Sequence, residues 1–141
     1  MTASATGGCL CGAVRYSIAG EVGPAGYCHC TDCRRVTGSA FNIAAPVRLT
    51  DFEIAGNLGS YSHPAESGMI LTRHFCAACG SPIYGGSPRH PDIIYVRAGS
   101  FDDPAVIRPK RQSWTRSRVE WAAIPSGIKT FDKGGGHALD T

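Results

Sequence analysis

The segment "GYCHCTDCRRVTGSAF" at residues 26–41 contains three cysteines within six residues, namely Cys28, Cys30 and Cys33. A closed structural zinc site takes four ligands, so this group by itself is one ligand short. A cysteine from a distant segment would close the site and tie that segment to this one. Whether the group is closed or stays open therefore decides which parts of the chain are held together.

The other cysteines form two local pairs. The sequence "CLC" holds Cys9 and Cys11, and the sequence "CAAC" holds Cys76 and Cys79. In an extended segment, residues i and i+2 project to the same face, so a C-x-C pair can bind one ion. In C-x-x-C, a tight turn brings both sulfurs to one ion, and Gly80 supplies the unhindered backbone that such a turn needs.

Two cysteines that are close in sequence can bind one metal ion at little cost in loop-closure entropy, so we expect each local group to bind a single ion. This leaves few ways to divide the seven cysteines among metal sites. Joining the two pairs gives a closed, structural site and leaves a group of three. Zinc with three protein ligands and one open position is typical of a catalytic site. We therefore expect two zinc ions per chain, a structural one on Cys9, Cys11, Cys76 and Cys79, and a catalytic one on Cys28, Cys30 and Cys33.

Other arrangements of the three-cysteine group stay open at this point. A histidine could close it, or the thiols could form a reactive cluster without a metal. His29 would point away from a metal if its segment is extended. His74 precedes Cys76 by two residues, but a histidine satisfied within a sheet is the better interpretation. A bacterial ferredoxin cluster does not fit, because the chain lacks its cysteine spacing and its Cys-Pro.

The composition is that of one ordinary globular domain. The chain has 141 residues, 43% hydrophobic and 18% charged, with a net charge of +3. Its first eight residues lack the features of a secretory signal, and no apolar run approaches the ~20 residues that span a membrane. We therefore expect a cytoplasmic protein without a membrane partner, in which the seven cysteines stay reduced.

The fold class follows from turns and alternation. The 18 glycines and 9 prolines favour a turn-rich β protein over a helical bundle. We predict an all-β fold, mainly β with minor helical turns, in which Pro46 limits its strand to an edge or an end. Strands are expected within 12–20, 39–47, 51–56, 69–75 and 92–101. A loop or hairpin connection is expected at 56–68, turns at 76–91, and helical turns within 102–107 and 117–124. The expected organisation is a flexible tail at 1–7, a zinc domain at 8–125 and a C-terminal extension at 126–141.

A three-cysteine zinc site suits a substrate sulfur. Three thiolates make the metal a poor Lewis acid, but a soft metal with soft ligands accepts a fourth sulfur. A coordinated thiol loses its proton and stays nucleophilic, which adds negative charge. Arg34 and Arg35 follow the third cysteine, so one of them could balance this charge or bind a substrate carboxylate. Both could equally be ordinary surface residues. The expected partner is a small-molecule thiol.

Positive side chains gather near the C-terminal end, at Arg108, Lys110, Arg111, Arg116 and Arg118. They form either a solvated face or a patch for an anionic substrate or nucleic acid, although the whole-chain charge is too low for the usual nucleic-acid signature. Trp114 and Trp121 are expected to pack as a hydrophobic patch against the sheet. The alternatives are a wall of the substrate pocket or a contact between copies of the chain in a homo-oligomer.

Three motifs carry a resemblance to a known family: "GGCLCGAVRY", "CHCTDCRRVTGSAF" and "RHFCAACGSPIY". In this order and spacing, between about Gly8 and Pro125, the chain resembles the glutathione-dependent formaldehyde-activating (GFA or CENP-V-like) family. The resemblance implies a zinc-stabilised Mss4-like or β-tent fold and the same two sets of zinc ligands.

The resemblance also implies a carbon–sulfur lyase that activates glutathione or a similar thiol for addition to formaldehyde or a related electrophile. With glutathione and formaldehyde the product is S-hydroxymethylglutathione. The alternative is a non-enzymatic zinc module that binds a macromolecule through the basic stretch from Arg108 to Arg118.

Overall fold

Two β-sheets make up most of the regular structure of residues 4–134, which are the residues described by the structure, a computed structural model. The strands are β1 (Ala5–Gly8), β2 (Arg15–Ile18), β3 (Ala25–Cys28), β4 (Asn42–Arg48), β5 (Phe52–Ala55), β6 (Leu58–Pro64), β7 (Ile70–Cys76), β8 (Pro82–Gly86), β9 (Ile93–Arg97), β10 (Pro109–Ser113) and β11 (Lys129–Thr130). One α-helix, α1 (Thr31–Thr37), and short 3₁₀ turns at Leu49–Asp51, Ala98–Ser100, Pro104–Val106 and Thr115–Ser117 complete the described elements.

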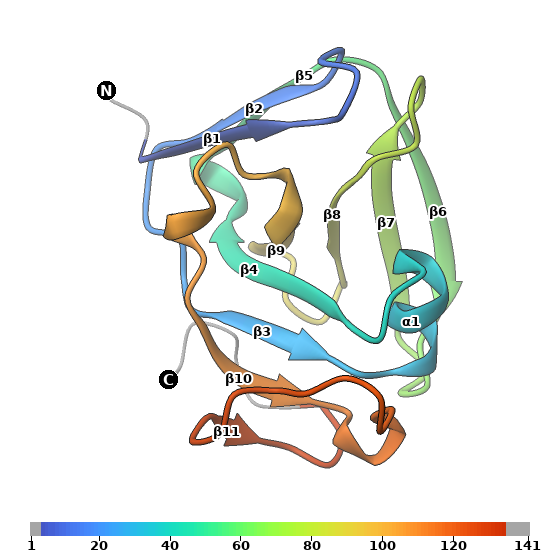
Figure 1. Cartoon of the computed structure of the whole chain (residues 1–141). Helices are drawn as coiled ribbons and strands as arrows, with labels where there is room; N and C mark the ends of the chain where they lie inside the picture. Colours follow the sequence, from blue (N-terminus) through green and yellow to red (C-terminus); the bar gives the residue numbers. More distant parts are fainter. Residues whose placement is uncertain (1–3, 135–141) are drawn as a thin grey trace.

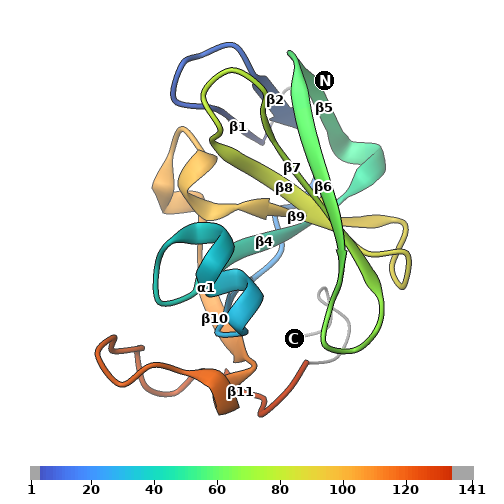
Figure 2. The same cartoon turned by 90° about the vertical axis from the view of Figure 1, so that its right-hand side faces the viewer.

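The larger sheet has the order β11-β10-β3-β4-β9-β8-β7-β6, and the smaller has the order β1-β2-β5. All pairs are antiparallel except β10 with β3 and β10 with β11. The larger sheet curls so strongly that β6 and β7 run steeply across the direction of β3 and β4 (Figure 1). In both views the smaller sheet and β11 lie at opposite ends of the molecule (Figures 1 and 2).

The hydrophobic core lies between the smaller sheet and the middle of the larger one. It is formed by Val14, Tyr16, Ile18, Val47, Cys76, Ile83, Ile94, Val96 and Phe101. The Tyr16 ring packs edge-on against Phe101 with centroids 5.8 Å apart, and its hydroxyl lies 2.7 Å from the Ser100 hydroxyl. This core therefore joins β2 to the segment that follows β9, and one of the seven cysteines, Cys76, is part of it.

The prediction of an all-β fold with minor helical turns is confirmed. Strands β2, β4, β5, β7 and β9 lie within the segments that alternation predicted, and the 3₁₀ turn at Pro104–Val106 lies within 102–107. Residues 5–8 form β1, so the first strand begins inside the expected N-terminal tail. Strand β11 lies inside the expected C-terminal extension, and residues 1–3 and 135–141 of the two expected tails lie outside the described residues.

Two loop predictions are wrong. Residues 58–64 form β6 and residues 82–86 form β8. Neither segment shows apolar alternation, because β6 is an exposed edge strand and β8 ends in two glycines. Both are stabilised by their ladders with β7, which local sequence does not reveal.

The prediction that Pro46 limits its strand to an edge or an end is wrong, because β4 lies between β3 and β9 and continues past Pro46 to Arg48. Strand β4 lies inside the sheet, but its pairing with β3 extends only to Ala44. Beyond that point the Pro46 carbonyl accepts a hydrogen bond from the Gly23 N–H (2.9 Å). The Pro46 nitrogen points to the same edge of β4 as its carbonyl. No β3 residue pairs with β4 at that position, so the N–H that proline lacks leaves no hydrogen bond of the sheet unmade.

The helical prediction for 117–124 is largely wrong, and so is the packing prediction for Trp121. Residues 118–124 form no helix, and the Trp121 side chain is 73% exposed. Trp114 takes a left-handed backbone conformation (φ 57°) and precedes a single 3₁₀ turn. Among residues 4–134, no helix has the length and apolar character needed to cross a membrane.

Candidate metal centres and their pocket

The first cysteine cluster joins two loops that are distant in sequence. Cys9 and Cys11 follow β1, and Cys76 and Cys79 lie at the turn between β7 and β8. Their four sulfurs lie within 4.8 Å of one another. The sulfurs of Cys9 and Cys11 are 3.6 Å apart and those of Cys11 and Cys76 are 3.8 Å apart. Tetrahedral zinc with ordinary zinc–sulfur bonds needs sulfurs about 3.8 Å apart, so this donor set fits zinc.

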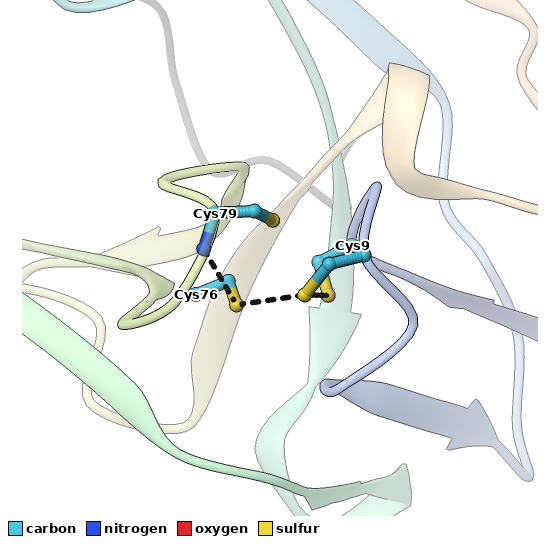
Figure 3. A group of neighbouring side chains, drawn as sticks. Cys9, Cys76 and Cys79 are labelled. Carbon is cyan, nitrogen blue, oxygen red and sulfur yellow. Dashed lines mark hydrogen bonds between the residues drawn. The ribbon is translucent and has the colours of Figure 1, made fainter.

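Backbone groups fix the sulfurs of this four-cysteine cluster. The Val14 N–H donates to Cys9 Sγ (3.2 Å), and the Cys79 N–H donates to Cys76 Sγ (3.4 Å). Figure 3 shows the Cys76–Cys79 turn facing Cys9 on the opposite loop. Gly80 has φ +79°, a conformation that glycine adopts without strain, and its N–H donates to the Cys76 carbonyl (2.9 Å). The turn predicted for "CAAC" is therefore present.

The extended conformation expected for "CLC" is wrong. Residues 10 and 11 form a turn in which the Gly12 N–H donates to the Cys9 carbonyl (3.3 Å), and the Leu10 side chain is 90% exposed. A turn brings the two sulfurs together as well as a strand would, and it places the hydrophobic residue between them in solvent.

The second cluster is local in sequence. Cys28 ends β3, Cys30 caps α1, and Cys33 lies in the first turn of that helix. Their sulfurs also lie within 4.8 Å of one another. The Cys33 N–H donates to Cys30 Sγ (3.2 Å), which satisfies a helix N–H that has no partner within the helix. No histidine, aspartate or glutamate among the described residues joins these three sulfurs in a larger donor group.

The thiols of the three-cysteine cluster share their protons unequally. The hydrogen bond from Cys30, together with a smaller effect of the hydrogen bond from Cys33, lowers the pKa of Cys28 to about 3. Hydrogen bonding to Cys28 and Cys30 raises the pKa of Cys33. The cluster therefore carries negative charge at neutral pH, which is the form of cysteine that binds metal ions.

His29 points away from the three sulfurs, as its place between two cysteines in an extended segment predicted. Its side chain is 1% exposed, and its Nε2 lies 2.9 Å from Gln112 Oε1 on β10. Gln112 Nε2 in turn donates to Thr130 Oγ1 on β11 (3.0 Å). His29 therefore connects the cysteine loop to the C-terminal strands. His74 does not join the four-cysteine cluster, because it stacks on Tyr84 with centroids 4.3 Å apart.

A pocket of about 330 Å³ opens beside the three-cysteine cluster, and Cys28 and Cys33 are part of its wall. Asn42, Arg73, Arg97 and Arg111 come from four different strands and line the same pocket. Arg97 is 7% exposed, and its Nη1 donates to Asn42 Oδ1. Burial and the nearby Arg73 lower the pKa of Arg97, whereas the cluster cysteines act on it in the opposite direction. The pocket therefore combines thiols with positive charge.

Comparison with known proteins shows the family of the chain. The family model described as "Glutathione-dependent formaldehyde-activating enzyme", or GFA, matches residues 4–117. The chain belongs to the GFA family.

Individual relatives of this GFA chain are distant in sequence. A Halomonas elongata protein named "Putative glutathione-dependent formaldehyde-activating enzyme" is 28% identical over 131 residues, which cover 85% of this chain and 80% of the relative. A Fusarium vanettenii protein of the same name is 23% identical, with 88% of this chain and 74% of the relative covered. A crystal structure of a Rhodobacter sphaeroides protein superimposes with a TM-score of 0.56 at 27% identity, covering 71% of this chain and 92% of the other.

The GFA chain positions different arginines at its pocket from those that the sequence suggested. Arg34 and Arg35 lie on α1, and neither is among the residues that line the pocket. Arg73 and Arg97 were missed because they are distant in sequence from the three cysteines. A sequence signal did exist for Arg97, since an arginine ends the strongly apolar run "IIYV". A charged residue in a buried strand needs a local reason to be there.

Proposed function

We propose that this protein is a zinc-dependent enzyme that adds a small thiol, glutathione or a similar compound, to formaldehyde or a related electrophile. In class it would be a carbon–sulfur lyase. The observation that carries the proposal is the three-cysteine cluster, which has one ligand fewer than a closed zinc site and forms part of a pocket wall. Membership of the GFA family supports the same activity.

The reaction joins the thiol to the carbonyl carbon. The sulfur–carbon bond forms while the π bond of formaldehyde breaks, and the proton released by the thiol ends on the former carbonyl oxygen, which gives R–S–CH₂OH. When bound to the cluster, zinc would leave one ligand position for the substrate sulfur and favour its deprotonated form.

The residues of the chain itself would hold and balance the charge. Cys28, Cys30 and Cys33 would hold the metal as thiolates, and Cys28 and Cys33 form part of the pocket wall. A substrate thiolate adds a fourth negative sulfur, and the buried guanidinium of Arg97 interacts electrostatically with the cluster. Arg97 therefore takes the charge-balancing role that the sequence alone suggested for Arg34 or Arg35.

The activity is tested by exchange NMR on equilibrium mixtures of glutathione and formaldehyde. The zinc-loaded protein is expected to accelerate exchange between free glutathione and its S-hydroxymethyl adduct above the uncatalysed rate. The Cys30→Ser variant, which loses one thiolate of the open cluster, is expected to lose that acceleration. If the zinc-loaded protein gives no acceleration with glutathione or with other cellular thiols, the proposal is wrong.

The macromolecule-binding alternative gains no support from the position of the basic stretch. Strand β10 divides this stretch, because Lys110 is exposed while Arg111 lines the pocket and lies over the Phe131 ring, 4.9 Å from its centroid. Arg111 therefore does not share the exposed surface of Lys110. Arg111 instead adds positive charge to the pocket of the proposed enzyme.

A further inference from the structure

Two of the arginines that line the pocket, Arg73 and Arg97, have no recorded acidic partner among the described residues. Within residues 4–134, the recorded ion pairs join Arg15 to Asp102 and Arg116 to Asp132. Among the described residues, those that line the pocket include no aspartate or glutamate. Arg73 and Arg97 therefore place positive charge in the pocket wall without an intramolecular carboxylate.

The recorded hydrogen bonds of Arg73 and Arg97 do not use all the N–H groups of their guanidinium side chains. Arg97 Nη1 donates to the neutral Asn42 side chain. Arg73 Nε donates to His63 Nε2 (2.8 Å), while Arg73 Nη2 is buried and has no acceptor among the described residues. A buried donor without an acceptor is costly, so a ligand oxygen that draws the guanidinium toward the pocket would stabilise it.

Like charges also act on each other here, because Arg73 lowers the pKa of the buried Arg97. Two neighbouring cations in a partly dehydrated wall repel each other unless an anion offsets them. Negative charge on the cysteine cluster offsets part of this positive charge near Arg97. Arg73, on the β7 side of the pocket, still lacks an anion of its own.

We propose that Arg73 and Arg97 form an anion subsite that binds a carboxylate or sulfonate group of the thiol whose sulfur occupies the three-cysteine site. This assignment rests on the proposed function, and it restricts the substrate to thiols that carry an acidic group. A guanidinium binds such a group through two parallel hydrogen bonds, and Arg73 and Arg97 together surround it with positive charge. Neutral and cationic thiols lack this interaction.

Calorimetric titration of the zinc-loaded protein tests the subsite. The ligands are 3-mercaptopropionate, 2-mercaptoethanesulfonate and neutral 2-mercaptoethanol. Arg73→Gln is expected to weaken binding of an anionic thiol by about tenfold or more, the scale of a lost charge-assisted hydrogen bond, and to leave 2-mercaptoethanol binding unchanged. Arg97→Gln also removes positive charge beside the cysteine cluster, so it is expected to weaken binding of every thiol and to weaken binding of the anionic thiols about tenfold more than binding of 2-mercaptoethanol. Because each ligand is compared with itself across variants, differences in thiol acidity cancel.

Arg48→Gln is the matched control, since Arg48 is exposed at the far end of β4 and does not line the pocket. It is expected to bind all three ligands as the wild type does. Metal analysis and circular dichroism check that every variant keeps its fold. If Arg97→Gln does not fold, two other measurements test the anion subsite. These are the binding of anionic thiols by Arg73→Gln and the expected weakening of their binding to the wild type in high salt.

The outcomes separate this inference from the proposed function. Tighter binding of either anionic thiol, lost in the pocket variants, supports the subsite, and the comparison of the two tells a carboxylate from a sulfonate site. Equal binding of anionic and neutral thiols, or a preference unchanged in the variants, overturns the subsite but leaves thiol binding intact. Failure of every thiol to bind overturns the proposed function and the subsite with it.

Discussion

At the scale of single residues, Cys30 combines two tasks. Its sulfur belongs to the three-cysteine cluster, and it accepts the Cys33 N–H at the start of α1. Serine is among the preferred residues at a helix N-cap, because its side-chain oxygen accepts the same kind of hydrogen bond. Replacing Cys30 by serine should therefore remove a thiolate and keep the cap.

We predict that Cys30→Ser lowers the zinc content from two ions per chain to one and leaves the fold unchanged. The cluster spans only residues 28–33, so its loss releases no distant segment. Metal analysis with circular dichroism measures both effects. Unfolding of this variant would show that the three-cysteine group is structural, which would contradict an open catalytic site.

At the scale of elements, one exposed ion pair links the smaller sheet to the segment after β9. Arg15 on β2 donates two hydrogen bonds to the Asp102 carboxylate, one of them 3.0 Å long, and Thr6 Oγ1 on β1 donates a third (2.7 Å). The Arg15 hydrogen bonds, followed by that of Thr6, lower the pKa of Asp102 to about 2. The ionised carboxylate is thus preferred in the folded chain.

This shift predicts a pH dependence with a definite sign. An unfolded aspartate has a pKa of about 3.9, so the stabilisation is fully present above that pH and is lost as the pH falls toward about 2. We predict that Asp102→Asn lowers the thermal midpoint at pH 6, and that the difference from wild type shrinks between pH 4 and pH 2. The exposed Glu66→Gln change serves as control. A difference that stays constant with pH would contradict the assignment.

At the scale of the whole molecule, the four-cysteine cluster joins segments that nothing local brings together. Cys11 and Cys76 are 65 residues apart, and Cys76 is also part of the hydrophobic core. A structural zinc site in a small domain contributes about 10–16 kcal/mol. Typical domains are stable by about 5–15 kcal/mol, so loss of this metal can exceed the whole stability of the fold.

We predict that Cys76→Ser, or exhaustive chelation of the wild type, unfolds the chain. Circular dichroism and proton NMR would show loss of strand signal and of chemical-shift dispersion. Cys30→Ser is the matched comparison, since it also removes one thiolate but is expected to stay folded. A native spectrum for Cys76→Ser without bound metal would mean that the core alone holds the two sheets together.

Alternation and chelate spacing are local properties, and from them the sequence predicted the all-β class, five of the strands and the grouping of the cysteines. The tertiary structure alone decided that 58–64 and 82–86 are strands, since their neighbours rather than their own residues stabilise them. It also decided which arginines approach the cysteines. Arg73 and Arg97 reach the pocket because the curled sheet brings β7 and β9 to the end of β3, and side-chain proximity across a sheet depends on strand order, which no local spacing encodes.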